Sequence, residues 1–385
     1  MKDISTPYRQ QYDLYRNEYY PEPVYVAPVT TAQQISAKAK AKPGKLRRHI
    51  WALCYGTALA AYTTFTLLNV FVIPHDTVKM DQSAMAEIYR TDSSSNVSAS
   101  GTVSDTGNST IISSDSSNIN TGSGDTGNTP TSGSTAGTVT ATETGYQYKD
   151  DSMTITLTQS YVNDTMVYIA DIQLSSIATL KSGLAEDSFG RNVKEKTSEI
   201  ADRVGAILAV NGDYYGFRDT GYVIRNGILY RGTMSSQTAQ DLVIYEDGSM
   251  KIIREGDVTA EELLDEGALQ VYSFGPGLII DGEITVTADS EVAQSMNSNP
   301  RTAIGYISPL HYVMVVSDGR TTESVGLSLL QLAEIMDQLG CEQAYNLDGG
   351  GSTTMYFNGE VINNPTSNGR KSKERSVSDI VYIGY

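Results

Sequence analysis

The 385-residue sequence is poor in the residues that build crosslinks and metal sites, with two cysteines, three histidines and one tryptophan. Two cysteines exclude a scaffold held by several disulfides, and three histidines leave little material for a His-rich zinc site. Basic residues are also scarce, 28 against 45 acidic, and a formal net charge of −17 argues against a nucleic-acid-binding protein. Catalysis must therefore depend mainly on carboxylates, hydroxyls, arginines and backbone amides.

Hydrophobic residues make up only 39% of the chain, but one uncharged run, Trp51–Ile73, is long and apolar. At about 1.5 Å per residue, such a helix can cross a hydrocarbon core of roughly 30 Å, so we expect a transmembrane signal anchor over residues 49–75. Basic residues precede the run, and the positive-inside rule then predicts a single-pass membrane protein with a cytoplasmic N-terminus and an extracytoplasmic C-terminal domain. The alternative is a cleaved signal peptide, which the long leader and the lack of an A-x-A site disfavour.

The segments on either side of this anchor lack the apolar periodicity of a core. Residues 1–48 form a Tyr-rich tail that we expect to be disordered and cytoplasmic, either solvated or docking an unknown partner. Its tyrosines are Tyr8, Tyr12, Tyr15, Tyr19, Tyr20 and Tyr25. Residues 76–145 combine a juxtamembrane segment, expected to be helical over residues 76–90, with a Ser/Thr/Gly-rich linker. That composition predicts a flexible spacer that holds the next domain off the membrane.

Strand and turn patterns begin near residue 146 and continue to the end of the chain. Five two-residue turn signals indicate antiparallel hairpins: Asn163-Asp164, Asn226-Gly227, Asp247-Gly248, Asp281-Gly282 and Asn358-Gly359. Capping boxes that begin at Thr259 and Ser328 open two helices, and a third helix is expected around Ser198–Val204. The sequence therefore predicts one α+β domain over residues 146–385, with mixed, largely antiparallel sheets and a few helices.

Three polar segments follow apolar strands and are candidates for chemistry. They begin at Asn211, at Ser317 and at Asp348, and each contains an Asp next to glycine. An Asp-Gly pair is most often an ordinary turn, and for Asp318 turn and site are equally favoured. The three glycines after Asp348 exceed what a hairpin needs and imply a close backbone approach, which favours a site there. The segment is neither a Walker A loop nor a dinucleotide fingerprint.

Arg301 and Arg375 are the cationic candidates, because each precedes a predicted strand and a guanidinium matches phosphate or carboxylate in shape. Taken alone, each arginine is more often a surface ion pair. His311 opens a strand and is interpreted as an ordinary strand residue, which disfavours a Ser-His-Asp triad.

In this order, the motifs VNGDYYG, PRTAIGY, VVSDGR, GLSLLQLAEIM, YNLDGGGSTTMYFNG and RSVSDIVYI resemble the phosphodiester glycosidase family, from about Gly205 to Tyr385. The resemblance implies a hydrolase that cleaves the sugar C1-to-phosphate bond of a glycan phosphodiester. Together with the predicted anchor, it leads us to expect a membrane-anchored extracytoplasmic hydrolase in cell-envelope or exopolysaccharide metabolism. A catalytically silent glycan-binding or envelope-assembly protein is the alternative, which the anchor and the tail suit equally well.

The resemblance also implies roles for single residues. Asp348, Asp318 and Arg301 are the expected catalytic residues, with an Asp as base or nucleophile and an Arg that offsets the phosphate charge. The expected substrate-binding residues are Asn211, Thr302, Gly349, Gly350, Gly351, Ser352 and Arg375. Asp213 departs from the family pattern and is not expected to be essential. No cofactor motif is recognised, although two Asp carboxylates are hard ligands that calcium or magnesium could use.

Overall fold

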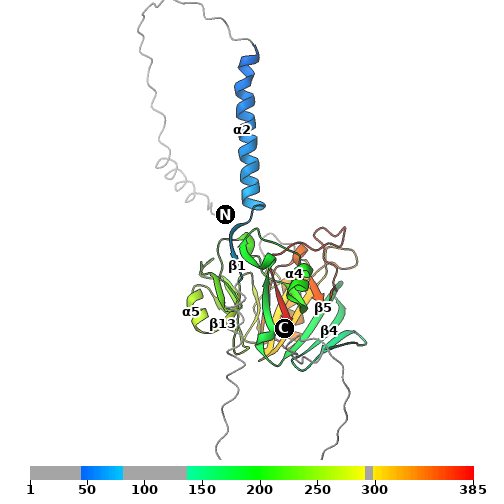
Figure 1. The fold of residues 1–385 in the computed structure, drawn as a ribbon. Helices are drawn as coiled ribbons and strands as arrows, with labels where there is room; N and C mark the ends of the chain where they lie inside the picture. Colours follow the sequence, from blue (N-terminus) through cyan, green and yellow to red (C-terminus); the bar gives the residue numbers. More distant parts are fainter. Residues whose placement is uncertain (1–44, 81–136, 291–297) are drawn as a thin grey trace, which may run out of the picture. The chain divides into compact units, whose positions relative to one another are not determined.

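The structure, a computed structural model, describes residues 45–80, 137–290 and 298–385 (Figure 1). Most of the predicted disordered tail and most of the predicted linker lie outside these residues, and residues 45–48 of the tail belong to helix α2 (Lys45–Phe71). The chain divides after Thr64 into two units. The C-terminal unit, Phe65–Tyr385, contains all of the described sheets and the candidate site.

Helix α2 (Lys45–Phe71) covers most of the predicted anchor. Its large apolar side chains, among them Leu53 and Phe65, are exposed. The hydroxyl of Thr57 donates to the backbone oxygen of Leu53 at 3.0 Å, so this polar group is satisfied within the helix. In the described part of the chain, no helix is both long and apolar enough to cross a membrane.

Strand β1 (His75–Lys79) follows α2 and pairs antiparallel with β7 (Ser188–Arg191). The Nδ2 atom of Asn192 donates to the backbone oxygen of Ile73 at 3.2 Å, which adds a second connection. The helix expected over residues 76–90 is therefore wrong at β1, where a strand forms instead. Because β1 pairs within the C-terminal unit, the segment after the predicted anchor is not only a spacer in front of the domain.

Three larger sheets and the two-stranded sheet of β1 and β7 form the domain, and every pairing between described strands is antiparallel. The largest has the order β15 (Glu283–Ile284), β14 (Gly277–Ile280), β18 (Gln343–Asn346), β16 (Arg301–Ser308), β17 (His311–Ser317), β5 (Thr165–Leu174), β4 (Met153–Val162), β3 (Gly145–Lys149) and β2 (Thr138–Ala141). The second has the order β10 (Ile228–Arg231), β9 (Val223–Arg225), β13 (Ala268–Tyr272), β11 (Gln240–Tyr245) and β12 (Met250–Arg254). The third has the order β20 (Glu360–Val361), β19 (Met355–Phe357), β8 (Ala206–Asn211), β21 (Asp379–Gly384) and β6 (Leu180–Leu184). The predicted α+β class is confirmed, but the described sheets are antiparallel rather than mixed.

The predicted hairpins and helices of the domain are confirmed. The Asn-Gly turn between β9 and β10, for example, has φ of 53° at Asn226 and 73° at Gly227, as a tight hairpin turn requires. Helices α4 (Thr197–Val204), α5 (Ala260–Asp265) and α6 (Leu329–Gln338) lie where expected. Both predicted capping boxes are present, with Thr259 and Ser328 as N-cap residues.

Successive side chains along the strands of the large sheet point to opposite faces, and each face packs into its own hydrophobic core. Tyr312, Met314 and Val316 of β17 belong to the main core, which also contains side chains from both five-stranded sheets. The intervening Val313 and Val315 lie on the other face, in the cluster that includes the apolar side chains of α6. The predicted site segments therefore project from the ends of well-packed strands.

In the third sheet, Ile380 of β21 pairs with Asn211, which aligns the start of β21 with the end of β8.

Candidate active site

A cavity of about 680 Å³ lies where β8 and β18 end and β21 begins. Its walls include Asp213 and Tyr214 after β8, Asp348 and Ser352 after β18, and much of segment 367–378 before β21. Three acidic residues, several hydroxyl-bearing residues and five cations thus line one space. Of the residues predicted from sequence, Asp348, Ser352 and Arg375 line it.

The three consecutive glycines are explained by close contacts with the rest of the chain. A Cβ atom at Gly349 would lie 2.8 Å from the backbone oxygen of Pro300, and one at Gly351 would lie 2.3 Å from Oγ of Ser367. Gly350 has a φ of 61°. The predicted close backbone approach is therefore confirmed, with partners inside the protein. These glycines are not among the residues that line the cavity, and their role in substrate binding stays a prediction.

Asp348 is the acidic residue that this turn contributes to the cavity wall. Its side chain is 13% exposed, and its Oδ2 lies 3.7 Å from Nη2 of Arg375. Burial raises the pKa of Asp348 above its ordinary value, while a hydrogen bond with Ser352 and the charge of Arg375 lower it. Arg375 itself donates from Nε to Oγ of Ser352 at 3.0 Å and from Nη2 to the backbone oxygen of Gly349 at 3.3 Å. The turn therefore orients the arginine beside the carboxyl group.

Asn211 and Thr302 hold this turn in place from beneath. Both are fully buried. The Nδ2 atom of Asn211 donates to the backbone oxygen of Asp348 at 2.6 Å, and Thr302 donates from Oγ1 to Oδ1 of Asn211 at 2.8 Å. Their contacts make them positioning residues. The predicted contact of either residue with substrate stays a prediction.

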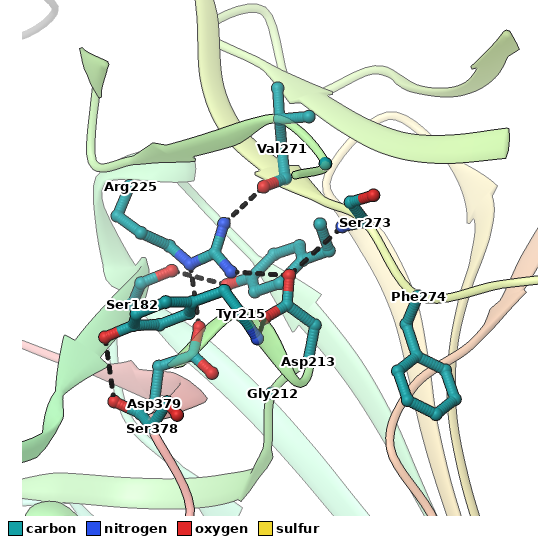
Figure 2. Close-up of polar contacts among 12 residues, drawn as sticks. Ser182, Gly212, Asp213, Tyr215, Arg225, Val271, Ser273, Phe274, Ser378 and Asp379 are labelled. Atoms are coloured by element: carbon teal, nitrogen blue, oxygen red, sulfur yellow. Dashed lines mark hydrogen bonds and ion pairs between the residues drawn. The ribbon is translucent and has the colours of Figure 1, made fainter. Parts of the chain in front are cut away.

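Behind the cavity lies a buried charge network of Asp213, Arg225 and Asp379, which Figure 2 shows in close-up. The Nη2 atom of Arg225 donates to Oδ2 of Asp213 at 2.9 Å, and its Nε donates to Oδ2 of Asp379 at 2.7 Å. All three side chains have zero exposure. Burial raises the pKa of Asp379 to about 7, Arg225 opposes this shift and Asp213 adds to it. Asp213, which sequence reasoning set aside, thus lies in the cavity wall while its carboxylate is buried in the network.

Gly212 is required for this arrangement. A Cβ atom at this position would lie 2.3 Å from Oδ1 of Asp379, closer than real atoms approach. The sequence VNGD therefore brings the main chain directly against the network, and the glycine is explained by contact within the protein.

The other two predicted catalytic residues lie elsewhere. Asp318 is buried and is not a lining residue, and its Oδ1 accepts from the backbone N of Asn364 at 2.8 Å while Oδ2 accepts from Tyr168 at 3.2 Å. Burial raises the pKa of Asp318 as well. Arg301 is also buried outside the lining, and its Nε donates to the backbone oxygen of Leu327 at 3.0 Å. The structure thus does not bring all four predicted charges into one cavity.

Sequence reasoning missed the cations of the cavity wall. Lys194, Arg370, Lys371 and Lys373 line the cavity together with Arg375. Four of these five belong to the segment Thr366–Arg375, which we call the basic loop. The run RKSKER in a chain of net charge −17 was the signal that could have found it. Arg225 could have been recognised less easily from the sequence. It is a charged residue in the otherwise apolar strand β9.

The cavity wall also contains two aromatic rings. Tyr214 and Phe217 stack with their centroids 4.6 Å apart, and Nζ of Lys194 lies 5.9 Å from the Phe217 ring. Aromatic surface next to a few placed polar groups is the usual composition of a small-molecule site. No group of three or more His, Cys, Asp or Glu side chains in the described residues could hold a metal ion.

Part of the cavity wall lies in a segment of the chain that matches a known protein family. Residues 204–384 match the phosphodiester glycosidase family. The match contains Asp213, Arg225, Asp348, Arg375 and Asp379.

Two relatives show how far the similarity extends. The SPbeta prophage-derived protein YomE of Bacillus subtilis is 32% identical over 203 residues, which cover 51% of this chain and 31% of YomE. The mouse N-acetylglucosamine-1-phosphodiester alpha-N-acetylglucosaminidase is 29% identical over 199 residues, which cover 46% of this chain and 38% of the mouse protein. The chain thus spans about a third of the length of these relatives.

Among solved structures, the zebrafish N-acetylglucosamine-1-phosphodiester alpha-N-acetylglucosaminidase catalytic domain is similar with a TM-score of 0.49 and 19% identity. The similarity covers 60% of this chain and 83% of the zebrafish chain.

Proposed function

We propose that this protein is a hydrolase that cleaves the bond between a sugar anomeric carbon and the phosphate of a glycan phosphodiester, in cell-envelope or exopolysaccharide metabolism. The observation that carries the proposal is the pair Asp348 and Arg375, which lie 3.7 Å apart in the wall of a cavity that also contains stacked aromatic rings. The family match of residues 204–384 and the activity that the name of the mouse relative states support the same chemistry.

In this proposal, water attacks the anomeric carbon and the bond from C1 to the phosphate oxygen breaks. Asp348 takes a proton from the water, and the phosphate leaves as a phosphomonoester that gains the proton. Arg375 offsets the charge that develops on the leaving phosphate, because its half-exposed guanidinium lines the same cavity as Asp348. Burial raises the pKa of Asp348 above its ordinary value, which makes its ionised carboxyl group a stronger base.

The aromatic pair and the buried network have supporting roles in this mechanism. Tyr214 and Phe217 offer a flat apolar surface for the sugar ring. Asp213 accepts from the backbone N of Tyr215 at 2.9 Å and from Arg225, so its two oxygens are committed to the protein. We therefore assign Asp213 to positioning of the segment that carries Tyr214.

The test is release of free sugar from the methyl phosphodiester of N-acetylglucosamine 1-phosphate by the full-length protein. We expect the sugar and methyl phosphate in equal amounts. The same assay is run on a panel of sugar 1-phosphodiesters. Binding of these compounds without release of sugar from any of them would instead favour a silent glycan-binding protein. A parallel reaction in chelator tests the sequence prediction of calcium or magnesium: activity that falls in chelator and returns with either ion supports it.

We further propose that the protein is anchored in a membrane with this domain on the extracytoplasmic side. The support is the uncharged segment Trp51–Ile73, which extends two residues beyond the end of α2, and the basic residues before it. Resistance of the full-length protein to extraction from membranes by alkaline carbonate would support anchoring. Release into the soluble fraction would contradict it.

A further inference from the structure

The charge of the cavity wall is opposite to that of the domain around it. From residue 137 to the C-terminus the chain has 34 acidic and 17 basic residues, yet five of those 17 basic residues line this one cavity. Four of them lie inside the basic loop, in the six-residue stretch from Arg370 to Arg375. Such a concentration in an acidic domain creates a local positive potential that attracts anions.

Most of these cations have no carboxylate partner. Some other cations of the domain do pair, as Arg191 does with Asp219 and Arg203 does with Glu195. In contrast, the side chains of Lys194 and of three basic-loop residues, Arg370, Lys371 and Lys373, form no ion pair with any described residue. Like charges that are held together without counter-charges repel each other, and a bound anion would relieve this repulsion.

A single phosphodiester does not balance this set of charges. Such a group has one negative charge, and Arg375 beside Asp348 is placed to meet it. Of the remaining acidic residues in the wall, Asp213 pairs with Arg225, and Glu374 accepts from the backbone N of Ser198 at 3.1 Å and from its hydroxyl at 2.6 Å. The four unpaired cations therefore exceed the charge of one phosphate and of Glu374 together.

We infer that the substrate is a polyanionic glycan with phosphate on successive units, in which one phosphate is cleaved beside Asp348 while neighbouring phosphates contact the basic loop. This inference rests on the proposed function and adds the class of substrate to it. Lys and Arg on an exposed loop can follow a flexible chain of phosphates without a fixed geometry, which suits a repeating polymer.

The test compares two compounds that share one sugar. The first is the methyl phosphodiester of N-acetylglucosamine 1-phosphate, with a single scissile bond, and the second is a trimer of N-acetylglucosamine 1-phosphate units. We expect the full-length protein to have a kcat/KM at least about tenfold higher on the trimer at low salt, with the preference declining as salt increases. In the triple variant Arg370→Gln, Lys371→Gln, Lys373→Gln, this preference should fall by about tenfold.

A matched control removes two exposed cations far from the basic loop in sequence, in the variant Lys251→Gln, Arg254→Gln on β12. It should keep the preference for the trimer. Cleavage of both compounds without a preference, or an equal preference in the triple variant, would overturn the inference and leave the proposed function intact.

A binding measurement separates the two proposals if neither compound is cleaved. Calorimetry with inorganic tripolyphosphate and with orthophosphate needs no turnover. Tighter binding of tripolyphosphate that is lost in the triple variant would support a polyanion site even if the proposed hydrolysis fails. Equal binding of the two anions, or no change in the triple variant, would contradict it.

Discussion

The buried charge network and the basic loop contribute to the same cavity but use charge in opposite ways. In the network, Arg225 has zero exposure and meets carboxylates on two sides. In the basic loop, Lys371 and Lys373 are exposed and meet none. A buried charge without a partner costs several kcal/mol, so the network must be complete before the domain is stable. An exposed charge without a partner costs little and stays available to a ligand. The network should therefore respond to mutation in stability, and the cavity wall in activity.

The largest effect should come from the carboxyl group that sequence and structure both favour. Asp348→Asn removes the proposed base and should lower kcat by about 10²- to 10⁴-fold, with little change in melting temperature. Asp318→Asn is the matched variant, because Asp318 is also buried at the end of a strand but bonds to Asn364 and Tyr168 instead of facing the cavity. It should mainly lower the melting temperature. Loss of activity in Asp318→Asn at unchanged stability would reverse the assignment.

Arg225→Gln should be the most damaging substitution for stability. It leaves Asp213 and Asp379 buried without their cation, at an expected cost of about 3–5 kcal/mol in the free energy of unfolding. Chemical denaturation measures this directly. The control is Asp379→Asn, which retains the Arg225–Asp213 pair and should cost less. An Arg225→Gln variant as stable as the parent would show that the network does not support the domain.

Arg375→Gln should lower kcat/KM by about 10²-fold, because the leaving phosphate loses its cation. The same variant should change the pH dependence. Arg375 lowers the pKa of Asp348, so without it that pKa rises further. If Asp348 must be ionised to accept a proton, the acid limb of the kcat/KM profile then moves to higher pH. An unmoved limb, or a shift to lower pH, would contradict the role of Asp348 as base.

The smallest effect is expected at Gly212. Gly212→Ala places a Cβ atom against Oδ1 of Asp379 and should destabilise the domain by about 1–3 kcal/mol. A double-mutant cycle with Asp379→Ala isolates the clash, since the alanine removes the oxygen that Gly212 contacts. Additive effects in this cycle would mean that the glycine is needed for another reason.

Local patterns predicted the frame of the domain well. The Asn226-Gly227 turn and the capping boxes at Thr259 and Ser328 depend on neighbouring residues only, and each formed as expected. The three glycines after Asp348 correctly indicated a close approach. What they approach, Pro300 and Ser367, comes from distant parts of the chain and could not be read from the pattern.

The site was harder to predict because Asp318 and Asp348 look alike in sequence. Each follows an apolar strand and precedes glycine, and only tertiary packing places Asp348 in the cavity wall and directs Asp318 toward Asn364. Arg225 and Asp379 were missed because their partnership spans 154 residues. The basic loop was visible in the sequence as a charge run, but its position over Asp348 follows from the pairing of β21 with β8.

The most direct test of the central claim is the position of bond cleavage. Hydrolysis of the methyl phosphodiester of N-acetylglucosamine 1-phosphate in water enriched in ¹⁸O, followed by mass spectrometry of both products, identifies the broken bond. Attack of water on the anomeric carbon predicts the label in the sugar and none in methyl phosphate. Label in methyl phosphate would mean attack on phosphorus, and would contradict a glycosidase at this site.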